Sequence, residues 1–205
     1  MSEGIGVRLV ALATLALLSA GAHAQEVPLK CEPRASGEQL TQRLSPYDSA
    51  SVRVGNMEAK ICYSRPIARG RVIFGGLVPY DMLWRTGANE ATTIHLPFAA
   101  EIAGIAIEPG KYSIYTVPST REWVVVVNAS TSQSGLTRDE GQFNNEYIAE
   151  VRAQEVGRGL AMSESIDEHV EQFTIRSEQT GIDSANIILE WERTRVRIPV
   201  RVRGS

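Results

Sequence analysis

The sequence contains few of the residues that hold metals and redox centres. It has two cysteines and three histidines among 205 residues, with no Cys-x-x-Cys pair and no His-Glu-x-x-His run. It also lacks the glycine-rich phosphate loop, the dinucleotide fingerprint and the Gly-x-Ser-x-Gly turn of many hydrolases. These absences argue against zinc and nucleotide sites, and we expect neither a metal nor a cofactor.

The chain also lacks an excess of charge of either sign. Lysine and arginine together number 21 against 24 aspartate and glutamate residues, which leaves a formal charge of −3. Proteins that bind nucleic acid usually carry a strong basic excess, so we expect no nucleic-acid partner. The length is that of one ordinary domain.

Residues 1–24 have the pattern of a signal peptide. Arg8 precedes an apolar run at residues 9–18, and residues 21–24, Gly-Ala-His-Ala, supply the small side chains that signal peptidase requires. The apolar stretch is shorter than the ~20 residues that span a bilayer. We therefore expect cleavage after Ala24, a periplasmic or secreted protein, and no membrane insertion of the mature chain.

Residues 25–44 are polar and show no helical or strand periodicity, so they are predicted to be a flexible lead-in. Cys31 lies in this segment, and Cys62 lies in the predicted folded domain at residues 45–205. In an oxidising compartment the two could pair, which would stabilise the fold by ~3 kcal/mol. The alternative is a buried free thiol at Cys62 and an exposed one at Cys31.

The domain has the pattern of β-structure almost throughout. Apolar and polar residues alternate at 57–63 and 93–98, as in half-buried strands, and residues 123–127 form a continuous apolar run. Short strands without a long helical period predict an all-β fold with little helix. We expect one β-sandwich or flattened barrel of about eight to ten mostly antiparallel strands.

Two connections are predicted from local residues. The segments 102–107 and 112–117 are joined by Glu-Pro-Gly-Lys, which favours a tight reversal and predicts a hairpin. Residues 157–168 are predicted to be a polar loop or a single helical turn.

The last predicted strand, 193–203, carries valine and isoleucine on one face and five arginines on the other. The arginines form either an anion-binding stripe or a solvated face that blocks edge-to-edge pairing. Pro199 indicates an edge or bulged position, because proline cannot donate to a ladder.

Polar groups and glycines gather between residues 65 and 93, where four arginines fall within 21 positions. Residues 84–90 then read Trp-Arg-Thr-Gly-Ala-Asn-Glu, a dense group of an aromatic ring, a guanidinium, an amide and a carboxylate. The candidate ligand-binding residues are Arg65, Arg71, Trp84, Arg85, Asn89, Glu90, Thr92 and His95.

Two explanations of this group are open. In a structural one, Arg85 pairs with Glu90 and Asn89 satisfies turn amides, so that the group holds a loop against the sheet. In a functional one, the arginines donate to a carboxylate, phosphate or sugar, Trp84 stacks on the ligand, and Glu90 accepts from its hydroxyls.

The same residues resemble the hallmark of the secreted bacterial family known as domain of unknown function 2911. The matching segments are Tyr63-Ser64-Arg65-Pro66, Gly70-Arg71, Ile73-Phe74-Gly75, Leu77-Val78-Pro79-Tyr80, residues 84–92, residues 109–113, Trp123 and Trp191-Glu192. The resemblance covers about residues 45–202. It implies an exported β-rich domain and supplies no activity.

Three functions are compatible with these observations. The first is a binding or envelope-interaction module for a small polar or anionic ligand such as a sugar or carboxylate. The second is a hydrolase or lyase with Glu90 or His95 as general base and Arg85 stabilising negative charge. The third is a structural protein in which the motif only fixes a loop.

Overall fold

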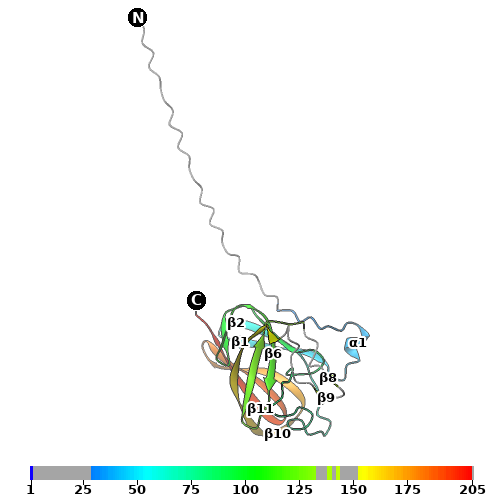
Figure 1. The fold of residues 1–205 in the computed structure, drawn as a ribbon. Helices are drawn as coiled ribbons and strands as arrows, with labels where there is room; N and C mark the ends of the chain where they lie inside the picture. The colour runs from blue at the N-terminus through cyan, green and yellow to red at the C-terminus, as the bar shows by residue number, and fades with distance from the viewer. Residues whose placement is uncertain (2–28, 133–137, 140–141, 144–151, 205) are drawn as a thin grey trace.

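The computed structural model describes residues 1, 29–132, 138–139, 142–143 and 152–204. These residues are almost entirely antiparallel β-structure, with a short helix α1 (Glu38–Thr41) before the strands (Figure 1). The predicted signal peptide after Met1 lies outside the described residues, as does the start of the lead-in. Within the described part, no helix has the length and apolar character needed to cross a membrane.

Nine of the described strands form one sheet in the order β1-β2-β3-β6-β7-β10-β11-β4-β5. Their bounds are β1 (Tyr47–Val54), β2 (Met57–Ser64), β3 (Thr92–Leu96), β4 (Ala100–Ile102), β5 (Ile105–Ile107), β6 (Gly110–Val117), β7 (Glu122–Asn128), β10 (Glu155–Gly181) and β11 (Ser184–Val202). A separate pair consists of β8 (Arg138–Asp139) and β9 (Gln142–Phe143). The prediction of an all-β sandwich or flattened barrel is confirmed.

The alternating pattern of β2 and β3 explains how these strands divide the core from the outer surface. Ile61 lies opposite Ile94, and Cys62 lies opposite Thr93. Because paired residues point to the same face of a sheet, the two isoleucines pack together in the core. Cys62 is directed to the other face.

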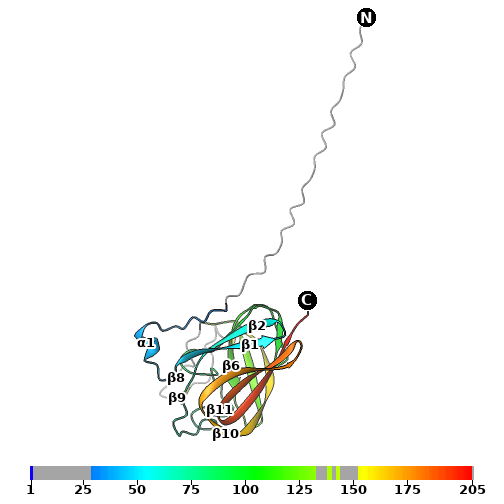
Figure 2. The same cartoon turned by 180° about the vertical axis from the view of Figure 1, so that it is seen from behind.

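The long hairpin of β10 and β11 closes the fold. The first part of β10 pairs with β7, whereas its second part pairs only with β11, and the register shifts between Ser165 and Thr174. Beyond this bend the hairpin lies against β1 (Figure 2). There the Ser177 Oγ donates to the Ser51 carbonyl at 3.1 Å. The sheet therefore folds over itself and encloses the core.

Residues 157–168, predicted to be a loop or helical turn, belong to β10, so that prediction is wrong. The apolar alternation is absent because the inward positions Gly157 and Gly159 have no side chain. At Gly159 even a Cβ atom would overlap the carbonyl oxygen of Ala103, where the β4–β5 hairpin approaches. The glycines thus permit a close backbone contact.

The predicted hairpin between residues 102–107 and 112–117 is also wrong. β5 pairs with β4 around a turn at Ala103 and Gly104, while β6 pairs with β3 and β7. The reversal at residues 108–111 therefore connects strands that are not neighbours.

Strand β11 is not an edge strand, because it lies between β10 and β4. Its pairing with β10 ends at Arg197, and its pairing with β4 begins at Val200. Pro199 lies between the two ladders, so its missing N–H breaks neither of them.

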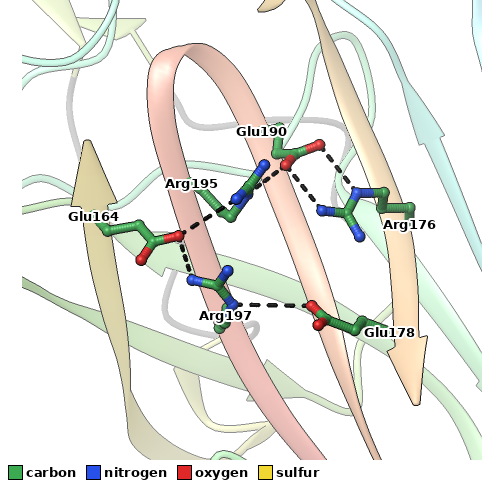
Figure 3. A network of polar contacts seen from close by, with 6 residues as sticks. All are labelled: Glu164, Arg176, Glu178, Glu190, Arg195 and Arg197. Carbon is green, nitrogen blue, oxygen red and sulfur yellow. Dashed lines mark hydrogen bonds and ion pairs between the residues drawn. The ribbon is translucent and has the colours of Figure 1, made fainter. Parts of the chain in front are cut away.

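Most of the arginine face on β11 is bound by carboxylates (Figure 3). Glu190 accepts from the Nε of Arg195 at 2.5 Å and is held by both Nε and Nη2 of Arg176, at 3.1 and 3.0 Å. Arg197 pairs with Glu164 on β10. These contacts favour a charged, solvated face over an anion-binding stripe.

The described part of the lead-in, 29–44, is attached to the domain. Cys31 and Cys62 lie at disulfide distance, with their Cα atoms 5.6 Å apart, as one of the two interpretations predicted. Further along, Arg43 forms an ion pair with Glu90. That this segment is flexible stays a prediction.

Candidate functional site

The loop at residues 65–91, between β2 and β3, is pinned to two different strands. On one side Trp84 and Thr116 of β6 exchange backbone hydrogen bonds of 2.7 and 2.9 Å. On the other side the Phe173 N–H on β10 donates to the Pro66 carbonyl at 2.9 Å. The loop therefore has a defined position over one end of the core.

An aromatic cluster lies beneath this loop. The rings of Trp84 and Trp191 are stacked, with centroids 6.0 Å apart, and Phe74 contacts both of them edge-on. Phe173 and Trp123 complete the cluster. Such pairs contribute roughly 0.5–1.5 kcal/mol each beyond their buried area. Trp84 therefore belongs to the core. A ligand can contact only the part of its ring that faces the loop.

A cavity of about 280 Å³ lies between the loop and the lead-in. Its volume is just below the range of about 300–1,000 Å³ that is typical of small-molecule sites. The lining residues are Leu44, Ser45, Pro66, Ile67, Arg69, Arg71, Leu77, Val78, Pro79, Met82, Leu83, Trp84, Arg85, Gly87, Ala88 and Trp191. Three arginines are the charged members of this set, which holds no acidic residue from the part of the chain that the structure describes.

The three arginines differ in how their guanidinium groups are held. Arg71 donates to the carbonyls of Ile67 and Ala68 at 2.6 and 2.9 Å. Arg85 donates to the carbonyl of Asn89 at 2.7 Å. The exposed side chain of Arg69 makes no hydrogen bond or ion pair with another described residue. Arg69 can therefore reorient toward a ligand, while Arg71 is fixed by its own loop.

Glu90 is buried beside the lead-in and is not among the cavity lining. Its carboxylate accepts from Arg43 Nη1 at 2.8–2.9 Å and from the Arg34 backbone N–H at 3.3 Å. The structure thus gives Glu90 a partner in the lead-in, where the sequence had suggested Arg85. The neighbouring Asn89 amide donates to the Ser45 carbonyl at 3.2 Å and holds the same segment.

Arg65 lies outside the cavity and joins three segments. It donates to Asp48 Oδ2 at 3.1 Å, to the Phe173 carbonyl at 3.1 Å and to Thr174 Oγ1 at 2.9 Å. These contacts tie the bend of β10 to β1. Arg65 therefore holds the start of the loop in place and does not line the cavity.

Thr92 and His95 lie on β3 and do not line the cavity either. The Thr92 hydroxyl is buried and donates to the Thr86 carbonyl at 2.6 Å. His95 is buried between Lys60 and Lys111 in the register of the sheet, on the face opposite to Ile94. Of the eight candidate residues, the structure brings Arg71, Trp84 and Arg85 together around the cavity.

Two tyrosines near the lead-in are strongly perturbed. Burial, together with the charge of Glu90, raises the pKa of Tyr47 to about 12. Burial also raises the pKa of Tyr115 to about 12, against the opposing effect of Arg34. Both phenols stay protonated at neutral pH. Among the described side chains, no three His, Cys, Asp or Glu residues gather where they could hold a metal ion.

The model of the family described as "Protein of unknown function (DUF2911)" matches residues 45–200. The chain belongs to the DUF2911 family. Searches among curated proteins and among solved structures found no match.

In this DUF2911 domain, segments far apart in the sequence meet at the aromatic cluster. Phe74, Trp84, Trp123 and Trp191 each come from a different one of the segments that carry the resemblance. Sequence reasoning placed Trp84 in a site but missed Trp191, because nothing local connects a residue of β11 to the loop. Arg69 is one of the four arginines at residues 65–85, so the sequence could have indicated it as a candidate ligand-binding residue.

Proposed function

We propose that this DUF2911 domain is an exported binding module that takes a small anionic ligand in the cavity of the 65–91 loop. The observation that carries the proposal is the cavity lining among the described residues, whose charged members are Arg69, Arg71 and Arg85. The nearby Glu171 lies outside this lining and accepts from the Arg69 backbone N–H at 2.8 Å, not from its guanidinium group. Guanidinium groups bind carboxylates and phosphates through charge-assisted hydrogen bonds.

The placement of the acid and base groups favours binding over catalysis. Neither Glu90 nor His95 lines the cavity, so a hydrolase or lyase that uses them would have its base outside the ligand site. The Glu90 carboxylate is already bound by Arg43. A general base must come within hydrogen-bonding reach of the proton that it removes.

The backbone of the loop gives further support. Arg69, Asp81, Thr86 and Asn89 all have φ between 52° and 61°, in the left-handed region that side chains disfavour. Asp and Asn adopt this region in ordinary turns, so the cost of about 1–2 kcal/mol applies mainly to Arg69 and Thr86. Strained residues of this kind concentrate at functional sites.

The test is equilibrium binding of benzoate and phenyl phosphate, followed by the fluorescence of the tryptophans beneath the cavity. In Arg69→Gln we expect about five- to tenfold weaker binding, because one charge-assisted contact is lost. Arg85→Ala should weaken binding as well. The matched control is Arg53→Gln, which removes an equal charge from an arginine side chain that is 75% exposed on β1.

The proposal fails if neither anion binds saturably, or if Arg69→Gln and Arg53→Gln bind as the unchanged protein does. A thermal melt of each variant shows that the fold is intact.

Export is a separate part of the proposal. It is supported by the signal-peptide pattern of residues 1–24 and by the disulfide distance between Cys31 and Cys62. Mass spectrometry of the protein recovered outside the cytoplasm should find Gln25 as the first residue. Recovery of the uncleaved chain from the cytoplasm alone would contradict export.

A further inference from the structure

The cavity has a charged mouth and an apolar interior. Arg69 and Arg71 are exposed at the surface, whereas Leu83, Trp84 and Trp191 are buried at the inner end. A ligand that fills this space meets the exposed guanidinium groups of Arg69 and Arg71 and the half-buried Arg85, whereas the buried part of the lining is apolar.

The inner end also offers no free indole donor. The Trp84 Nε1 donates to the Gly87 carbonyl at 3.0 Å, and the Trp191 Nε1 donates to the Glu171 carbonyl at 3.3 Å. Among the lining residues, Ser45 is the one uncharged polar side chain with a hydroxyl or amide. A sugar placed there would leave most of its hydroxyls without partners, which is costly in an apolar site.

Apolar side chains continue onto the surface around the mouth. Leu44 and Leu77 line the cavity and are 72% and 36% exposed. Val72 is 67% exposed, and its carbonyl accepts from the Leu77 N–H at 3.0 Å. Tyr80, 39% exposed, follows in the same loop. Leu44 and Leu77 therefore form an apolar collar within the lining, and Val72 and Tyr80 add exposed apolar side chains to the same loop.

We infer that the ligand is a single-chain amphiphilic anion that enters with its apolar end first and leaves its charged head at Arg69 and Arg71. The inference rests on the proposed function and specifies its ligand class. The head is a carboxylate or phosphate, because guanidinium groups bind both through charge-assisted hydrogen bonds. The apolar chain lies on the tryptophan floor, and the collar contacts the part of the chain nearest the head.

The test is a homologous series of butanoate, hexanoate, octanoate and decanoate, titrated below their micelle concentrations. Each methylene that enters the cavity should strengthen binding about fourfold, so each two-carbon step should give about 15-fold. The gain should stop when the chain outgrows the cavity. Octyl phosphate against octanoate shows which head is preferred, and octanol, which has no charge, should bind more weakly than either.

Two variants separate the head from the chain. Arg69→Gln should weaken all four carboxylates by the same factor and leave the gain per methylene unchanged. Ala88→Phe adds a ring to the cavity lining, so it should reduce the gain per methylene for octanoate and decanoate by more than it reduces the binding of butanoate. Ala88→Ser, which keeps the size of the side chain, is the matched control, and thermal melts report on the fold.

The outcomes distinguish this inference from the function on which it rests. Binding that depends on Arg69 but does not change with chain length would overturn the amphiphile and keep the anion site. A gain with chain length that is unchanged in Ala88→Phe would place the chain elsewhere and overturn the inference too. Equal affinity for octanol and octanoate would show that the site does not recognise an anionic head. Absence of all binding would refute both proposals.

Discussion

The link between Cys31 and Cys62 permits a quantitative prediction. The two residues are 31 positions apart in the sequence, so a bond between them closes a loop of that length in the unfolded chain. In the chain-entropy treatment this lowers the free energy of folding by about 3.5 kcal/mol. For a domain of this size, ~1 kcal/mol shifts the melting temperature by about 2–4 °C, so loss of the bond should lower it by roughly 7–14 °C.

The assay is a thermal melt followed by circular dichroism, with and without a phosphine reductant. Cys31→Ser is the informative variant, because Cys31 is half-buried whereas Cys62 is 1% exposed and its replacement would also disturb packing. Reductant should lower the melting temperature of the unchanged protein to that of Cys31→Ser and should leave the variant unaffected.

Thiol counting in denaturant provides an independent check on the same bond. The unchanged protein should react only after reduction, whereas Cys31→Ser should show one thiol immediately. Two reactive thiols in the untreated protein, or a melting temperature indifferent to reductant, would refute the reasoning.

Three other changes have expected outcomes that unfolding experiments can measure. Gly159→Ala should lower the free energy of unfolding, measured in urea, by about 1–3 kcal/mol, because the added Cβ meets the backbone of Ala103. Gly204→Ala, with open space around it, should have no effect. Equal stability of the two variants would contradict this reasoning. Arg43→Ala leaves the Glu90 carboxylate buried without its cation, so the free energy of unfolding should fall by about 3–5 kcal/mol. The double variant Arg43→Ala with Glu90→Gln should recover part of this loss. A fall below about 1 kcal/mol would show that the pair is not buried in solution. Burial alone would raise the pKa of Glu190, but hydrogen bonds from Arg176 and Arg195 outweigh it and hold that pKa below its usual 4.5. The Glu190 carboxylate therefore contributes its full stabilisation to the fold above pH 4.5, and this contribution is lost as the pH falls through the lower pKa of the folded state. The free energy of unfolding of the unchanged protein should therefore fall more in acid than that of Glu190→Gln.

Strands with one buried face were predictable because their pattern is local. Ile61 and Tyr63 alternate with polar neighbours, and the residues 123–127 are a continuous apolar run, so burial could be inferred from each segment alone. The part of strand β10 at residues 157–168 was missed for an equally physical reason. Gly157 and Gly159 fill its inner positions, and a close backbone approach replaces the apolar side chains that would have revealed it.

The candidate site was predictable only in part, because several of its contacts join distant residues. Trp84 and Arg85 were found from the composition of a short motif. The ion pair between Arg43 and Glu90 spans 47 positions, and the stacking of Trp84 on Trp191 depends on the bend in the long hairpin. No spacing rule within a segment carries that information.

The contacts of the lead-in bear on where the working unit of this protein begins. The family match starts at residue 45, yet Leu44 lines the cavity, Arg43 neutralises Glu90, and Cys31 reaches Cys62 from further upstream. A chain shortened to the family boundaries would keep Glu90 without the cation of Arg43 and Cys62 without Cys31. It would also lose Leu44 from the cavity lining. The smallest piece that keeps the cavity together with these two links must therefore start no later than Cys31, outside the region by which the family is recognised.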